Sequence, residues 1–134
     1  MTRQVTITTG EALMLHLELN GLNDGTNNIT GLLRHKLPFN IKLNLHKLSS
    51  QTELIKSAYD AEIMPVFERL GTIVNDRYTI SSDSPNMAEY QKINFELLNT
   101  KVPIDVPAIN LEELANIEDE YYDQIFAKVY TTQN

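Results

Sequence analysis

Residues 38–70 read PFNIKLNLHKLSSQTELIKSAYDAEIMPVFERL, and this stretch decides what kind of fold the chain adopts. Its first part fits two patterns. Apolar residues from Phe39 to Leu45 occupy every second position, which is typical of a half-buried strand. A second pattern, with steps of four and three residues, is typical of one helix face and comprises Ile41, Leu45, Leu48, Thr52, Ile55 and Tyr59. Only the helical pattern continues without a break, so we predict a helix.

Prolines and a glycine mark the limits of this helix. Pro38 suits the first helical position, where a missing N–H costs nothing, and Gly71 ends the pattern. Pro65 removes a backbone hydrogen bond inside the helix, so we expect a kink or a restart there. A continuous helix would be roughly 50 Å long, whereas a compact domain of this size is about 36 Å across. We therefore expect either that Pro65 folds the helix back or that another chain covers the excess length.

The flanking segments predict further elements. Residues 5–7 are β-prone, Thr8 or Thr9 can cap a helix that runs from Glu11 to Gly21, and residues 73–80 read as a hairpin around Asn75-Asp76. Ser84 and Pro85 start a helix that continues to about residue 99. Residues 102–106 alternate as a strand, which Pro103 and Pro107 restrict to an edge or an extended arm. Residues 110–113 resemble a capping box that opens a last helix.

These elements predict a helix-dominated α+β fold. It would have two or three main helices, one of them long and kinked near Pro65, with a small β-hairpin and a short extended edge strand. The 134 residues, 42% of them hydrophobic, are enough for one domain over residues 1–134 with its own core. We expect residues 1–9 and 131–134 to be flexible or extended ends.

Composition excludes several classes of function. The chain has no Cys, so disulfides, thiol nucleophiles and Cys-ligated zinc are excluded. No apolar stretch is long enough to span a bilayer, and no secretory signal is visible, so we expect no membrane role. The formal charge is −7, of which residues 102–134 carry −6. Because this acidic region repels phosphate backbones, we expect no direct binding to nucleic acid.

The sequence offers little catalytic chemistry. Its five glycines do not have the spacing of a phosphate-binding loop, and its three histidines do not form a zinc motif, so we expect no cofactor and no metal. His46 and Ser50 would share a helix face, but nothing in the sequence supplies an orienting group or an oxyanion hole. We interpret them as polar surface residues and expect no enzymatic activity.

Protein–protein contact remains as the class of function that the pattern favours. Tyr121 and Tyr122 are adjacent on the predicted last helix, so both cannot enter one core seam. The acidic residues beside them are typical of a solvated face, and such a face can dock a basic partner. The extended segment could add to the edge of a partner's sheet. The candidate interface residues are Ile55, Tyr59, Val102, Ile104, Val106, Glu118, Asp119, Glu120, Tyr121, Tyr122 and Asp123.

The layout also resembles a family of small proteins encoded by tailed bacteriophages. The matching stretches are Leu37-Pro38, residues 67–71, 96–99 and 102–106, and the Ile-x-Leu-Glu-x-Leu turn at residues 109–114. Pro65 departs from the uninterrupted long helix of that family. The resemblance implies a phage gene product that works in the virion or in the host cytoplasm, and it supplies no functional residues to transfer.

Together these observations predict a non-enzymatic phage protein that acts through contacts with itself or with other phage or host proteins. The leading interpretation is a self-associating component of the virion or of its assembly. The alternative is a small acidic inhibitor or adaptor of a host defence or nucleic-acid-handling protein, and a third interpretation is an enzyme of unknown type.

Overall fold

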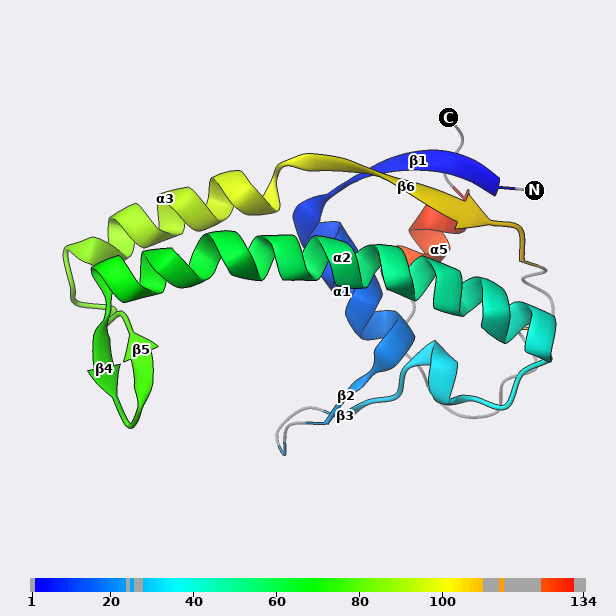
Figure 1. Ribbon diagram of the computed structural model, residues 1–134, viewed down its shortest axis with the longest axis horizontal. Coiled ribbons are helices and arrows are strands. Elements are labelled where there is room, and N and C mark those ends of the chain that lie inside the picture. The colour runs from blue at the N-terminus through cyan, green and yellow to red at the C-terminus, as the bar shows by residue number, and fades with distance from the viewer. Residues whose placement is uncertain (1, 24, 26–27, 110–113, 115–123, 132–134) are drawn as a thin grey trace.

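The computed structural model describes residues 2–23, 25, 28–109, 114 and 124–131 and shows a mostly helical α+β fold (Figure 1). The described helices are α1 (Thr9–Asn20), α2 (Phe39–Leu70), α3 (Asn86–Leu98) and α5 (Gln124–Thr131), with a 3₁₀ turn at Leu32–Arg34. The strands are β1 (Thr2–Thr8), β2 (Leu22–Asn23), β3 (Asn28–Ile29), β4 (Thr72–Val74), β5 (Arg77–Thr79) and β6 (Lys101–Pro107). Each described strand belongs to a two-stranded antiparallel pair: β1 with β6, β2 with β3, and β4 with β5.

Helix α2 confirms the helical interpretation of the decisive stretch. It contains 32 residues and runs through Pro65 without interruption. Of the kink or restart expected at Pro65, the restart is therefore wrong. The side chains of Pro65 and of Ala61, one turn earlier, are both exposed. The carbonyl that loses its helical hydrogen bond therefore lies on the solvent side, where water can satisfy it.

The core lies between the first half of α2, helix α1 and the β1–β6 pair. On α2 the buried residues there are Ile41, Leu45, Leu48 and Thr52, which belong to the predicted helix face. Helix α1 begins with a capping box, in which the Thr8 hydroxyl accepts the Glu11 N–H and the Glu11 carboxylate accepts the Thr8 N–H. The other buried apolar residues of this core include Val5, Ile7, Ala12, Leu15, Leu19, Leu32, Ile104, Val106, Leu114, Phe126 and Val129.

The second half of α2 extends beyond this core, and the chain itself covers it. Helix α3 runs antiparallel along it: Tyr59 donates to Asn94 at 2.5 Å, and Arg69 pairs with Glu89 at 3.2 Å. The β4–β5 hairpin follows α2 and projects from its end (Figure 1), with Asn75 and Asp76 at positive φ as the predicted turn requires. Neither a fold-back at Pro65 nor a second chain is needed to explain this length.

The distal arm, residues 59–98, is nevertheless thin. Helix α3 has no buried residue, and the buried residues of the arm are Ile63, Leu70 and Ile80. None of these three belongs to the main core cluster. The arm is therefore a layer of two helices and a hairpin with apolar groups on its surface.

Candidate functional site

The predicted interface residues of α2 face inward. Ile55 is half-buried and packs against the main core. Tyr59 is half-buried too; burial is the main reason why its pKa is raised, with Tyr90 and Asp60 adding to the effect. Together with Val102 these residues line a cavity of about 210 Å³ between α2, α3 and β6. This face therefore belongs to the protomer's own packing.

Ile104 and Val106 do not form a surface either, because their side chains lie in the core. The remaining edge of β6 is also closed. The Gln51 side chain donates to the Asp105 carbonyl and accepts the Asp105 N–H, both at 2.7 Å. In an antiparallel strand, the backbone N–H and C=O groups of alternate residues point away from the partner strand. The backbones of Pro103 and Pro107 therefore face the same outer edge as that of Asp105. This edge consequently offers no free N–H between residues 103 and 107. The prediction that this segment adds to the edge of a partner's sheet is therefore wrong.

The open edge of the sheet belongs to β1. In the same register, Gln4 pairs with Asp105 and Thr6 pairs with Pro103, so the backbone groups of Gln4 and Thr6 point outward from the β1 edge. Among the described residues, neither backbone has a hydrogen-bond partner on that side. The Thr8 N–H, next on the same edge, is occupied by the Glu11 carboxylate.

The acidic and aromatic candidates near the C-terminus lie outside the described residues. These are Glu118, Asp119, Glu120, Tyr121, Tyr122 and Asp123, together with the predicted capping box at residues 110–113.

Helix α5, which follows them, is held by a carboxylate that sequence reasoning missed. Glu18 of α1 is fully buried and accepts the N–H groups of Ile125 and Phe126 at 2.8–3.0 Å. These donors belong to the first turn of α5, where a negative charge is favourable. Lys128 also bonds to Glu11. Burial opposes ionisation of Glu11, but the bonds from Lys128 and Thr8 outweigh it and hold the pKa of Glu11 below its ordinary value.

A polar cluster between α1 and α2 has the outline of a catalytic triad. The ring of His16 lies 2.9 Å from the Thr52 hydroxyl and 3.0 Å from the Glu53 carboxylate. Thr52, however, is completely buried, and its hydroxyl donates to the Ser49 carbonyl. A nucleophile must reach its substrate, so this arrangement ties two helices together and cannot attack a ligand.

The His46 and Ser50 pair also forms no catalytic contact, since the Ser50 hydroxyl donates to the His46 backbone carbonyl at 3.0 Å. No group of three metal-ligating side chains occurs among the described residues. Within the same part of the chain, no helix is long and apolar enough to cross a membrane.

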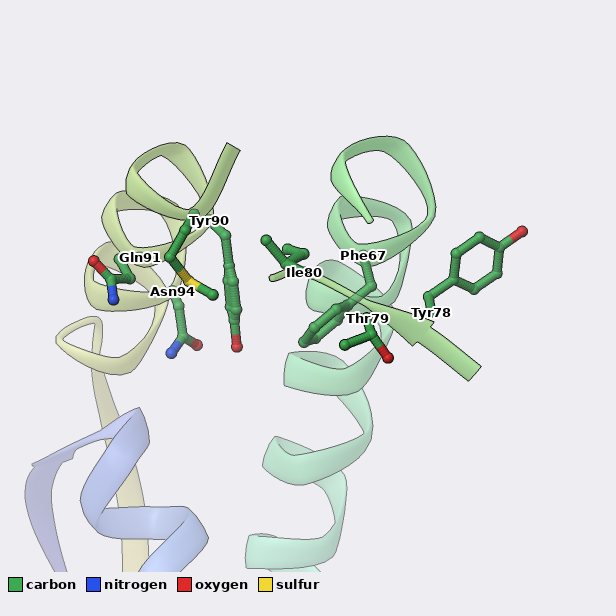
Figure 2. Close-up of a pocket in the computed structure, with 8 residues that line it drawn as sticks. Phe67, Tyr78, Thr79, Ile80, Tyr90, Gln91 and Asn94 are labelled. Carbon is green, nitrogen blue, oxygen red and sulfur yellow. The ribbon is translucent and has the colours of Figure 1, made fainter. Parts of the chain in front are cut away.

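A second cavity, of about 440 Å³, lies in the distal arm between α2, β5 and α3 (Figure 2). Phe67 and Tyr90 meet there edge to face with ring centroids 4.8 Å apart. In Figure 2, Phe67, Ile80 and Tyr90 lie between the two helices, whereas the Tyr78 ring points outward. The titratable groups of the lining are the phenols of two tyrosines, and it has no carboxylate, imidazole or ammonium group. The cavity is lined by Phe67, Tyr78, Thr79, Ile80, Met87, Tyr90, Gln91 and Asn94.

The outer face of α2 carries the clearest interaction surface. Figure 1 shows α2 extending along the whole molecule, with α1 packed behind its first half. On its opposite side four large apolar side chains remain exposed: Phe39 (79%), Leu43 (43%), Leu54 (73%) and Met64 (49%). Leu54 directly precedes Ile55, so neighbouring residues of one helix separate the core face from this outer face.

Comparison with protein-family models, curated proteins and solved structures gave no match to this chain.

Proposed function

We propose that this protein is a non-enzymatic, self-associating protein, and that it serves as a structural or assembly component. The observation that carries the proposal is the row of exposed apolar side chains on the outer face of α2. Isolated exposed hydrophobic residues are ordinary, but several on one face of one long helix are typical of an interaction surface. The residues predicted at the interface from the sequence, Ile55 and Tyr59, lie on the other side of the same helix.

The distal arm supports the same proposal. Phe95 of α3 and Ile73, Val74 and Tyr78 of the hairpin are also exposed, at 40–68% of their surface. A two-helix layer with few buried residues gains stability when a partner covers it, because burial of apolar surface contributes about 25 cal/mol per Å². An assembled state would therefore stabilise the part of the molecule that its own core does not reach.

The phage setting comes from the layout of the sequence. The resemblance to small proteins of tailed bacteriophages supports a role in the virion or its assembly, in which many copies of one chain contact each other. The charge of −7 supports solubility before assembly and is unfavourable for contact with nucleic acid.

The test is the solution mass of the purified full-length chain, measured by light scattering over a range of concentrations at low and high salt. We expect a mass above that of the 15.3 kDa monomer that persists at high salt, because apolar contacts are not screened by ions. A monomer at every concentration would refute self-association and would leave contact with a different protein, which pull-down from a host lysate addresses.

A further inference from the structure

We propose that α2 pairs with α2 of a second copy, antiparallel, along a stripe on its outer face. The inference rests on the proposed self-association and names the surface and its register. The stripe consists of Leu43, Lys47, Ser50, Leu54, Ser57, Ala61 and Met64, all of them exposed. Its steps alternate between four and three residues, which is the spacing of the contact positions in a coiled coil.

The order of residues along the stripe is self-complementary when one copy is reversed. Around a two-fold axis at Leu54, that residue faces its own copy, Ser50 faces Ser57, and Leu43 faces Met64. Large side chains thus meet large ones at the centre and at both ends. Between them the small Ser50 and Ser57 let the helices approach closely, within the usual interaxial distance of about 8–10 Å.

Charge complementarity argues for a second copy and for the antiparallel direction. Lys47 forms no ion pair with a described residue. In the antiparallel register its stem covers Ala61 of the partner subunit, and its ammonium group lies beside the partner's Asp60. The symmetry repeats this contact. In a parallel pair, Lys47 would instead face the same lysine of the other copy, and like charges at a contact position destabilise.

One like-charge contact remains in this register, where Glu53 approaches its own copy. Within each protomer, the Glu53 carboxylate is bonded to the His16 ring at 3.0 Å, which draws it toward α1 and away from the two-fold axis. Asp60 is bonded to Lys56 on its own helix at 3.0 Å, so it keeps a partner in the monomer as well.

The size of the stripe sets the expected strength. From Leu43 to Met64 it is about 32 Å long, and a helix is about 10 Å wide. A strip of these dimensions is smaller than the roughly 800 Å² that each partner contributes to a standard interface. We therefore expect a reversible dimer whose subunits exchange, and this exchange makes mixing experiments possible.

Engineered cysteines test the register, because the chain has none of its own. Ser50→Cys and Ser57→Cys variants, one of them carrying a tag that changes its mass, are mixed under mild oxidation. The antiparallel register predicts a disulfide between the two different variants. Neither variant should link to itself, since like positions would be about 9–12 Å apart along the axis, beyond the roughly 7 Å that a disulfide allows. Ser81→Cys, on an exposed linker, is the control and should not link to Ser57→Cys.

Self-linking of each variant, or no link between the two, would overturn the register. A second measurement concerns strength: Leu54→Glu should raise the dimer dissociation constant roughly tenfold or more, whereas Glu62→Lys, off the stripe on the same helix, should change it little. Because Leu54 and Glu62 are both exposed, both variants should keep the wild-type circular dichroism spectrum.

The charge contact has its own test. Lys47→Glu should weaken the dimer, and Lys47→Glu combined with Asp60→Lys should restore it in part. If the wild-type chain forms an oligomer that Leu54→Glu leaves intact, the stripe is refuted while self-association stands. If the wild-type chain is a monomer at every concentration, the proposed function is refuted as well.

Discussion

The buried carboxylate of Glu18 should be an essential polar attachment of helix α5, beside the packing of Phe126 and Val129 in the core. The side chain is fully buried on α1 and accepts the N–H groups of Ile125 and Phe126 at 2.8–3.0 Å. Replacing Glu18 with Ala leaves two N–H donors at the start of α5 without this acceptor. A buried donor that loses its partner costs about 1–3 kcal/mol, so we expect Glu18→Ala to lower the free energy of unfolding by about 2–6 kcal/mol.

Two further variants serve as comparisons for Glu18→Ala. Glu18→Gln keeps the size and one acceptor oxygen but removes the charge that favours the helix N-terminus, so its destabilisation should be intermediate. Glu68→Ala removes an exposed carboxylate from α2 and should change stability by less than about 0.5 kcal/mol. Urea denaturation followed by circular dichroism, at one fixed protein concentration, gives the three free energies.

Hydrogen exchange locates the effect. In Glu18→Gln the amides of residues 124–131 should become less protected before those of α1 and α2, because the substitution weakens the hydrogen bonds that dock α5. If Glu18→Ala is as stable as Glu68→Ala, or if protection of α5 is unchanged, the carboxylate does not hold this helix and the reasoning is refuted.

Two further predictions concern the β1–β6 pair and the loop before α2. Burial raises the pKa of Tyr130, whose hydroxyl donates to the Pro107 carbonyl at 2.8 Å. As the pH rises, Tyr130 therefore ionises in the unfolded chain first, so the stability that its neutral phenol contributes is complete below about pH 10 and disappears above it. Between about pH 9 and 11, the free energy of unfolding should decrease less steeply in Tyr130→Phe than in the wild type. Equal slopes in urea titrations would contradict this. A Cβ on Gly31 would overlap the backbone of Asn20 and Gly21, so Gly31→Ala should destabilise by about 1–3 kcal/mol. Thermal denaturation should show this destabilisation, and an unchanged melting temperature would exclude the overlap.

Several elements could be predicted from local sequence because their causes are local. The Asn75-Asp76 turn requires positive φ, which Asn and Asp tolerate, and both residues have it. The sequence left the cap of α1 open between Thr8 and Thr9; Thr8 is the cap, and it forms a capping box with Glu11. The decision between helix and strand over residues 39–45 needed a longer window, because only the continuation to Tyr59 separates the two periods.

The candidate site was harder to predict from the sequence than these elements. A periodic apolar stripe says which residues share a face, but it does not say whether that face meets the chain's own core or another molecule. The stripe of Ile55 and Tyr59 was assigned to an interface because the long helix had to overhang a compact domain. Helix α3 and the hairpin cover that length, so the stripe belongs to the protomer and Leu54 faces outward.

The sequence by itself therefore determined the long helix, the hairpin turn, the cap of α1 and the extended segment with prolines on one edge, since each depends on residues close together in the chain. The tertiary structure decided what each surface faces. It pairs β6 with β1, closes the other edge with Gln51, and buries Glu18 against a helix that begins more than a hundred residues later. Such choices depend on the free energy of contacts between distant segments, and no local pattern records them.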